Sequence, residues 1–184
     1  MIEAELKARV RDLGRLQGQL DTLAAREICT YSDTHCDWPG RQLSAGGREL
    51  RLRLVMAEGR PRSLLTYKEP AVDSASGSKP EHETAVADAP VIDVMLRALG
   101  LAPMVAFEKH CTNYRFEARG REMLATLVRV PELNGTFIEI ETMTDESAMK
   151  TALADVRAIF AELGVPEDDL TAEQYTDAVM KARA

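Results

Sequence analysis

Ionisable side chains stand at every second position along several short segments of this 184-residue chain. Glu3 and Glu5, and again Glu139 and Glu141, place two carboxylates about 7 Å apart on one face of an extended chain. Such carboxylates repel each other, and a bound cation best explains them. Basic side chains in the same arrangement are best explained by a polyanion, because the arginine fork matches phosphate oxygens. The residues that could carry this chemistry are Glu3, Glu5, Lys7, Arg51, Arg53, Lys68, Glu81, Glu83, Lys109, Arg129, Glu139 and Glu141.

The metal expected from these residues is Mg²⁺ or Mn²⁺. Carboxylate oxygens without a cysteine or histidine cluster favour these ions over zinc, and Mg²⁺ is commonly shared between carboxylates and substrate phosphates. The three cysteines show no C-x-x-C spacing, and the histidines are interpreted as incidental: His35, His82 and His110. The alternative is an open sheet with one solvated face. That alternative weakens because the same pattern recurs on six predicted strands.

Alternation of apolar and polar residues predicts the strands that position these side chains. Ile2 to Val10 is a clear case, with apolar residues at even positions and charged residues at odd ones. Strands are expected over 2–10, 27–31, 50–55, 63–68, 81–86, 105–116, 123–130 and 136–142. A hairpin turn is expected at Arg119-Gly120, a polar loop over 32–47 and a small-residue loop over 71–79.

Apolar residues at spacings of three and four predict helices between these strands. Helices are expected over 13–23, 88–100 and 149–163, the second capped by Asp88 with Pro90 in its first turn. Thr171 and Gln174 indicate a capping box for a short last helix. These elements predict an antiparallel α+β fold with helices packed on the apolar faces of the sheet. If the sheet closes into a barrel, acids and bases line its interior.

Composition excludes several classes of protein. The net charge of −7 and the isoelectric point near 5.1 argue against a general nucleic-acid binder. No apolar run approaches the roughly 20 residues that span a bilayer, and the first residues do not form a signal peptide. Three cysteines without metal spacing favour a reducing cytoplasm over a disulfide scaffold.

The ordered set of motifs resembles the CYTH superfamily, also called triphosphate tunnel metalloenzymes. The matching segments are E-x-E-x-K at 3–7, D-T at 33–34, G-x-x-L-R-x-R at 47–53, the lysine at 68, E-x-E at 81–83, the lysine at 109 and G-x-F-x-E-x-E at 135–141. They run over nearly the whole chain, from Ile2 to about Tyr175. Their spacing and the chain length look most like the class IV adenylyl cyclase branch.

This resemblance implies one CYTH-like domain over residues 1–184, built as an eight-stranded antiparallel barrel that forms a tunnel. The basic residues that would bind the triphosphate are Lys7, Arg51, Arg53, Lys68 and Lys109. The acidic residues that would hold the metal are chiefly Glu139 and Glu141, with Glu3 and Glu5 as partners. Catalytic roles fall to Glu5, Lys7 and Glu81, while Glu81 and Glu83 would orient the basic residues or hold a second metal.

Two positions depart from the family pattern. Cys111 stands where the family has an arginine, and Arg129 stands where it has an acid. We therefore hypothesise that Arg129 supplies the guanidinium that is missing at Cys111. The two positions would then lie on neighbouring strands and share a face.

The resemblance implies a metal-dependent enzyme that acts on a triphosphate, above all one that converts ATP to cyclic AMP and pyrophosphate. The alternatives are a triphosphatase that hydrolyses tripolyphosphate or thiamine triphosphate, and a non-catalytic triphosphate binder. A solvated sheet serving as an interaction module is the third reading. The expected partners are a small-molecule triphosphate and, as an option, a second copy in a homodimer, with no nucleic acid and no membrane.

Overall fold

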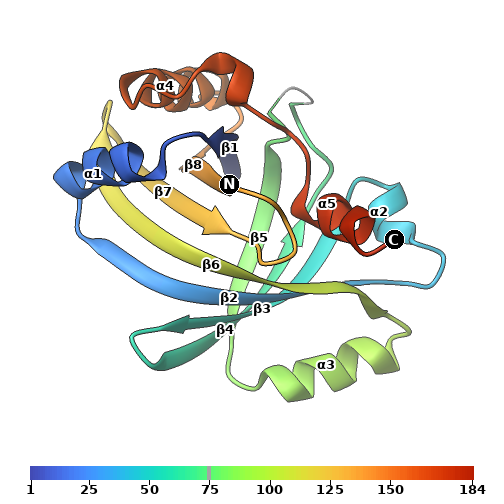
Figure 1. Ribbon diagram of the computed structural model, residues 1–184. Coiled ribbons are helices and arrows are strands. Elements are labelled where there is room, and N and C mark those ends of the chain that lie inside the picture. The colour runs from blue at the N-terminus through green and yellow to red at the C-terminus, as the bar shows by residue number, and fades with distance from the viewer. Residues whose placement is uncertain (74–75) are drawn as a thin grey trace.

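The computed structural model describes residues 1–73 and 76–184. Within these residues, eight antiparallel strands close into a barrel in the order β1-β5-β4-β3-β2-β6-β7-β8 (Figure 1). The expected α+β barrel is confirmed. The strands are β1 (Ile2–Val10), β2 (Arg26–Asp37), β3 (Glu49–Ala57), β4 (Arg60–Lys68), β5 (Lys79–Val86), β6 (Ala102–Ala118), β7 (Arg121–Arg129) and β8 (Thr136–Thr144).

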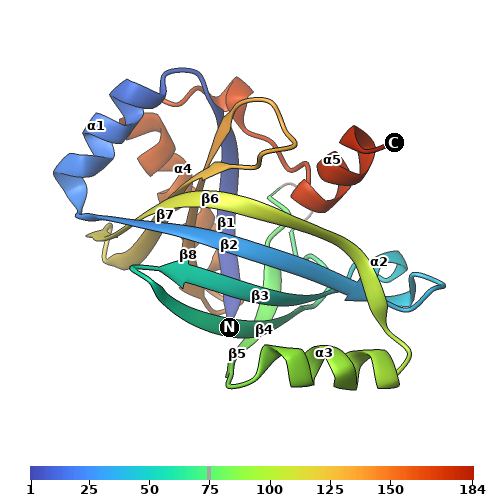
Figure 2. The same ribbon diagram turned by 60° about the horizontal axis from the view of Figure 1, so that its bottom comes forward.

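The helices lie outside the barrel. They are α1 (Leu13–Leu23), α2 (Gln42–Ala45), α3 (Ala89–Ala98), α4 (Met149–Glu162) and α5 (Tyr175–Ala182), with a 3₁₀ turn at Glu167–Asp169. In Figure 2, α1 and the β3–β4 and β6–β7 hairpins lie at one side of the barrel, and α2 and α5 lie at the other. None of the helices in the described part of the chain has the length and apolarity that a membrane crossing requires.

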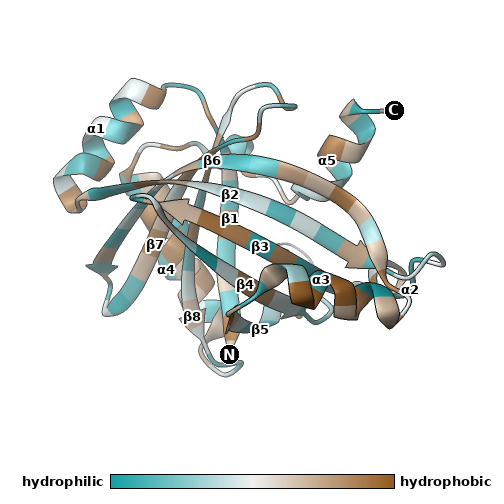
Figure 3. Ribbon diagram, turned by 90° about the horizontal axis from the view of Figure 1, so that it is seen from below, coloured by the Kyte–Doolittle hydropathy of each residue, from teal (hydrophilic) through white to brown (hydrophobic). Residues whose placement is uncertain are grey.

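The outer faces of β1 and β8 are apolar where helix α4 covers them. Leu6 of β1 and Ile138 and Ile140 of β8 are buried with Val156 and Phe160 of α4 in the largest apolar cluster. Side chains on opposite sides of a strand alternate, so the residues between these positions must face the barrel interior. Colouring by hydropathy shows this alternation of hydrophilic and hydrophobic residues along several strands (Figure 3). On β1 and β8 the charged residues therefore lie on the interior face.

Helix α3 covers a second apolar cluster at the lower side of the barrel. Leu96 of α3 packs with Leu43 and Cys36, and Trp38 packs against the same cluster. The predicted cap is confirmed, since the Asp88 carboxylate accepts a hydrogen bond from the Val91 backbone N–H.

Two local predictions were wrong. Strand β2 continues through the expected loop to Asp37, because residues 32–37 pair with strand β6 on one side and residues 32–36 pair with β3 on the other. These two ladders outweigh the polar composition of the segment. The capping box is also wrong: Gln174 is the N-cap of α5 and makes no side-chain cap, while Thr171 Oγ1 accepts from the Glu173 N–H. The expected small-residue loop over 71–79 includes residues 74–75, which lie outside the described residues.

Candidate active site

The barrel encloses a cavity of about 760 Å³. Among the described residues, eight carboxylate and eight basic side chains line it. The acids are Glu3, Glu5, Asp33, Glu49, Glu81, Glu83, Glu139 and Glu141, and the bases are Lys7, Arg51, Arg53, Arg62, Lys68, Lys79, Lys109 and Arg115. Charges of both signs are thus held together in a partly dehydrated space, where they interact more strongly than in water.

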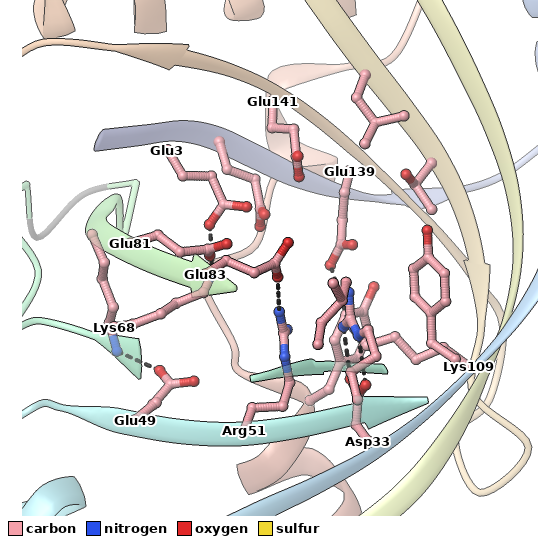
Figure 4. A pocket seen from close by; sticks show the side chains of 18 of the residues that line it. Glu3, Asp33, Glu49, Arg51, Lys68, Glu81, Glu83, Lys109, Glu139 and Glu141 are labelled. Carbon is pink, nitrogen blue, oxygen red and sulfur yellow. Dashed lines mark hydrogen bonds and ion pairs between the residues drawn. The ribbon is translucent and has the colours of Figure 1, made fainter. Parts of the chain in front are cut away.

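Three carboxylates converge at one side of this cavity. Glu3 and Glu5 of β1 and Glu141 of β8 each offer an oxygen, and these oxygens lie within 4.8 Å of one another. Glu5 and Glu141 are directly opposite in the β1–β8 pairing. Figure 4 shows Glu3 and Glu141 pointing into the common space. We call Glu3, Glu5 and Glu141 the carboxylate triad.

Burial and mutual repulsion perturb the triad strongly. Burial, together with the nearby Glu139 and Glu3, raises the pKa of Glu5 to about 8. Burial and the nearby Glu3 and Glu5 raise the pKa of Glu141 well above its ordinary value. Burial also acts to raise the pKa of Glu3, but the Lys68 ammonium outweighs it and lowers that pKa to about 2. Carboxylates under this repulsion would be relieved by a cation.

The triad fits the expected metal. Three carboxylate oxygens from a rigid strand pair, with no sulfur or imidazole among them, are the donor set that Mg²⁺ or Mn²⁺ prefers. Glu139 is not part of this group of three, although it is close enough to raise the pKa of Glu5, and one of its oxygens lies 4.0 Å from the Lys109 ammonium. The structure therefore brings Glu3, Glu5 and Glu141 together and places Glu139 between this group and Lys109.

Glu81 and Glu83 contact the basic residues. The Lys68 ammonium bonds to Glu3 and lies 2.8 Å from a Glu81 oxygen. Glu83 accepts a 2.8 Å hydrogen bond from the Thr66 hydroxyl, which in turn accepts from Arg51. The Nε of Arg51 is buried and has no hydrogen-bond partner in the described part of the chain, so it is free to donate to an anion.

The carboxylate of Asp33, to which the sequence had assigned no role, fixes the Arg53 side chain. Its Nε and Nη2 donate to the two oxygens of Asp33 at 2.6 and 2.7 Å, and its guanidinium lies 4.3 Å from the centre of the Tyr31 ring. Arg53 lowers the pKa of Asp33 far below its ordinary value against the opposing effect of burial. This pair lines the β2–β3 side of the cavity.

Lys7 and Lys109 approach each other around Tyr175, the first residue of α5. Their ammonium nitrogens lie 4.3 and 4.2 Å from the centre of that ring. Lys7 also donates to the Glu173 carbonyl. The segment before α5 thus fills the end of the cavity next to the two lysines.

Arg129 does not lie in the cavity, and the hypothesis that it replaces a guanidinium at Cys111 is wrong. Cys111 pairs with Val128, whereas Arg129 pairs with His110, and both of these side chains are exposed on the outer face. The physical reason is the hairpin register. A two-residue turn at Arg119-Gly120 aligns Cys111 with Val128, so the side chain of Arg129 lies on the opposite face of the sheet from that of Cys111.

Sequence reasoning missed several lining residues. His35, interpreted as incidental, is buried and stacks on Phe107 with the ring centres 5.7 Å apart. Burial and the Arg51 guanidinium lower the pKa of His35 to about 4. Glu49 and Lys79 both line the cavity and form an ion pair with each other. The alternation of side chains along β2 could have identified His35 as a lining residue, because Asp33 and His35 lie on the same face of the strand.

Comparison with known proteins agrees with this fold. A family model described as the CYTH domain matches residues 1–175. The chain belongs to the CYTH domain family. This CYTH protein is 23% identical over 178 residues to "Putative adenylate cyclase MJ0240" of Methanocaldococcus jannaschii, covering 96% of this chain and 98% of that one.

Solved structures share the fold. The PH1819 protein of Pyrococcus horikoshii has a TM-score of 0.84 at 25% identity, covering 97% of this chain and 98% of its own. A protein of Vibrio parahaemolyticus described as a putative adenylate cyclase has a TM-score of 0.80 at 22% identity and 98% coverage of both chains. The Hippeastrum protein HpAC1, named as a putative adenylyl cyclase and reported to have a dominant triphosphatase activity, has a TM-score of 0.67 at 16% identity, covering 98% of this chain and 96% of its own.

Proposed function

We propose that this CYTH protein is a metal-dependent enzyme that binds a triphosphate in its barrel, and that the reaction is the cyclisation of ATP to cyclic AMP and pyrophosphate. The observation that carries the proposal is the juxtaposition of the carboxylate triad with a set of buried basic side chains in one cavity. Phosphoryl and nucleotidyl transfer depend on positioning and charge neutralisation more than on covalent chemistry by the protein. A cavity of this kind supplies both.

Each group of residues has a distinct role in this proposal. Lys7, Arg51, Arg53, Lys68 and Lys109 bind the phosphate oxygens. Glu81 and Glu83 hold Lys68 and Arg51 in place. Glu3, Glu5 and Glu141 hold the divalent ion, and Glu139 lies beside Lys109.

In the cyclisation, the 3′-oxygen of the ribose forms a bond to the α-phosphorus. The bond from that phosphorus to the bridging oxygen of the β-phosphate breaks, pyrophosphate leaves with the electron pair, and the hydroxyl proton is released to water. A bound divalent ion would neutralise phosphate charge and lower the pKa of the attacking oxygen. The basic side chains stabilise the charge that grows on the leaving pyrophosphate.

Hydrolysis of the terminal phosphate is the second candidate, and the reported triphosphatase activity of the Hippeastrum protein favours it. The same side chains would serve, with water in place of the ribose hydroxyl. The two reactions differ in which phosphorus lies next to the carboxylate triad.

Product analysis separates the candidates. Purified protein is incubated with ATP, thiamine triphosphate or tripolyphosphate, each with Mg²⁺ or Mn²⁺, and the products are separated. Cyclic AMP with pyrophosphate supports cyclisation, orthophosphate supports hydrolysis, and binding without a product identifies a triphosphate binder.

Variants link the activity to the cavity. We expect Glu141→Gln and Glu5→Gln to lower kcat at least about 100-fold, because each removes a charged ligand of the ion. Arg129→Ala is the matched control, since it removes a charge on a neighbouring strand but on the outer face. Equal activity of Glu141→Gln and the wild type would contradict the proposed site.

A further inference from the structure

A second cavity adjoins the barrel interior beside the carboxylate triad. Its volume is about 710 Å³, within the range of pockets for small organic molecules. The β6–β7 hairpin and the end of β8 form it, and the hairpin lies below α4 in Figure 1. Four residues line both cavities: Arg115, Leu124, Glu141 and Met143.

The strand register fixes the position of the triad between the two cavities. Arg115 pairs with Leu124, Leu124 with Glu141, and Glu141 with Glu5, so one row of side chains crosses four strands. The five basic residues proposed to bind phosphate all line the first cavity, and none of them is among the described residues that line the second. An ion held by the triad would therefore lie where the phosphate chain meets the second cavity.

The charges in the second cavity do not suit a polyphosphate. Glu117 and Glu122 are directly opposite in the β6–β7 pairing and line this cavity with Glu141. Arg121 donates to Asp155 of α4 at 2.9 Å and is already paired. Acids thus outnumber the remaining base, and an added phosphate group would be repelled.

The other lining groups suit an uncharged ring system. Met143 is 44% exposed and Leu124 is half-buried, so both offer apolar surface beside the triad. The Arg115 side chain is exposed, and a planar guanidinium can stack on an aromatic base. The part of the first cavity lined by Tyr175 suits a nucleoside less well, because the Tyr175 ring is in contact with two lysine ammonium groups there.

We propose that the second cavity binds the nucleoside end of a nucleoside triphosphate, with Arg115 stacked on the base and Leu124 and Met143 against the sugar and base. This inference rests on the proposed function and adds the orientation of the substrate. With the nucleoside in this cavity, the α-phosphate lies next to the triad and the terminal phosphate lies among the basic residues. That orientation supports attack on the α-phosphorus rather than on the terminal one.

The test compares two ligands that share the phosphate chain and differ in the nucleoside. Dissociation constants for ATP and for tripolyphosphate, each with Mn²⁺, are measured by thermal-shift titration. We expect Arg115→Ala to raise the dissociation constant for ATP about tenfold, because the stacking on the base is lost. The dissociation constant for tripolyphosphate should change by no more than about twofold. Arg115→Lys keeps the positive charge but lacks the planar guanidinium, so its ATP binding should resemble that of the alanine variant. Arg129→Ala, an exposed arginine on the outer face, should change neither constant.

A second variant fills the cavity instead of emptying it. Met143→Trp should weaken ATP binding and spare tripolyphosphate. Met56→Trp is its matched control, because Met56 is 41% exposed on β3 outside both cavities. Both methionines are solvent-accessible, so melting of the free variants near the wild-type temperature shows that the fold is intact.

Each other outcome overturns the inference. If Arg115→Ala weakens both ligands equally, Arg115 contacts phosphate or metal and the nucleoside lies elsewhere, while the proposed function stands. If neither ligand responds to either variant, the second cavity is not used. If the wild type binds tripolyphosphate but not ATP, no nucleoside site exists. If it binds neither, the proposed function itself fails.

Discussion

Breaking the ion pair between Arg53 and Asp33 should lower the free energy of unfolding by an amount that can be estimated from the structure. The Asp33 side chain is 0% exposed and that of Arg53 is 12% exposed, and two short hydrogen bonds join them. Removing one partner of such a buried pair costs about 3–5 kcal/mol, because a charge is left in the interior. Arg51 and Lys109 also act on Asp33 and remain in place. We therefore expect Arg53→Met to cost about 3 kcal/mol, at the lower end of the range.

A double-mutant cycle in urea measures this pair. With a slope of about 2 kcal/mol per molar urea, Arg53→Met should lower the midpoint by about 1.5 M. Asp33→Asn should cost less, about 1–2 kcal/mol, because Arg53 keeps the Tyr31 ring and some contact with water. The double variant should be more stable than the sum of the two losses predicts, by about 1–2 kcal/mol. A loss below about 1 kcal/mol for Arg53→Met, or simple additivity, would refute this account of the pair.

Three further results are expected. Between pH 6.5 and about 4, His35 is protonated in the unfolded chain but stays neutral in the folded protein, so the free energy of unfolding of the wild type decreases as the pH is lowered through this window. Urea unfolding at pH 7 and at pH 4.5 should show that the His35→Gln variant loses about 2–3 kcal/mol less than the wild type. Equal losses in the two proteins would contradict the burial argument. Mn²⁺ should raise the melting temperature of the wild type, and Glu141→Gln should remove most of that rise; an undiminished rise would place the ion away from the triad. Arg129→Ala should not change the rise in melting temperature that tripolyphosphate produces, because Arg129 is on the outer face. A smaller rise in the variant would show that Arg129 contributes to the site.

Much of the fold could be predicted because its determinants are local. Alternating residues such as those in Ile2–Val10 define which side chains share a face, whatever the strand later pairs with. The turn at Arg119-Gly120 likewise implied its hairpin. The extent of β2 was not local in this sense, since its polar second half becomes a strand only because β3 and β6 pair with it on both sides.

The sequence by itself determined that acids and bases alternate with apolar residues on successive strands, and that their order matches the CYTH family. Only the tertiary structure decided which of these charges meet. Closure of the barrel placed Glu141 beside Glu3 and Glu5, left Glu139 with Lys109, turned Arg129 outward, and brought the last helix to the lysines. The reason is that the two-residue period of a strand is fixed by neighbouring residues, whereas register and closure depend on pairings between segments far apart in the chain.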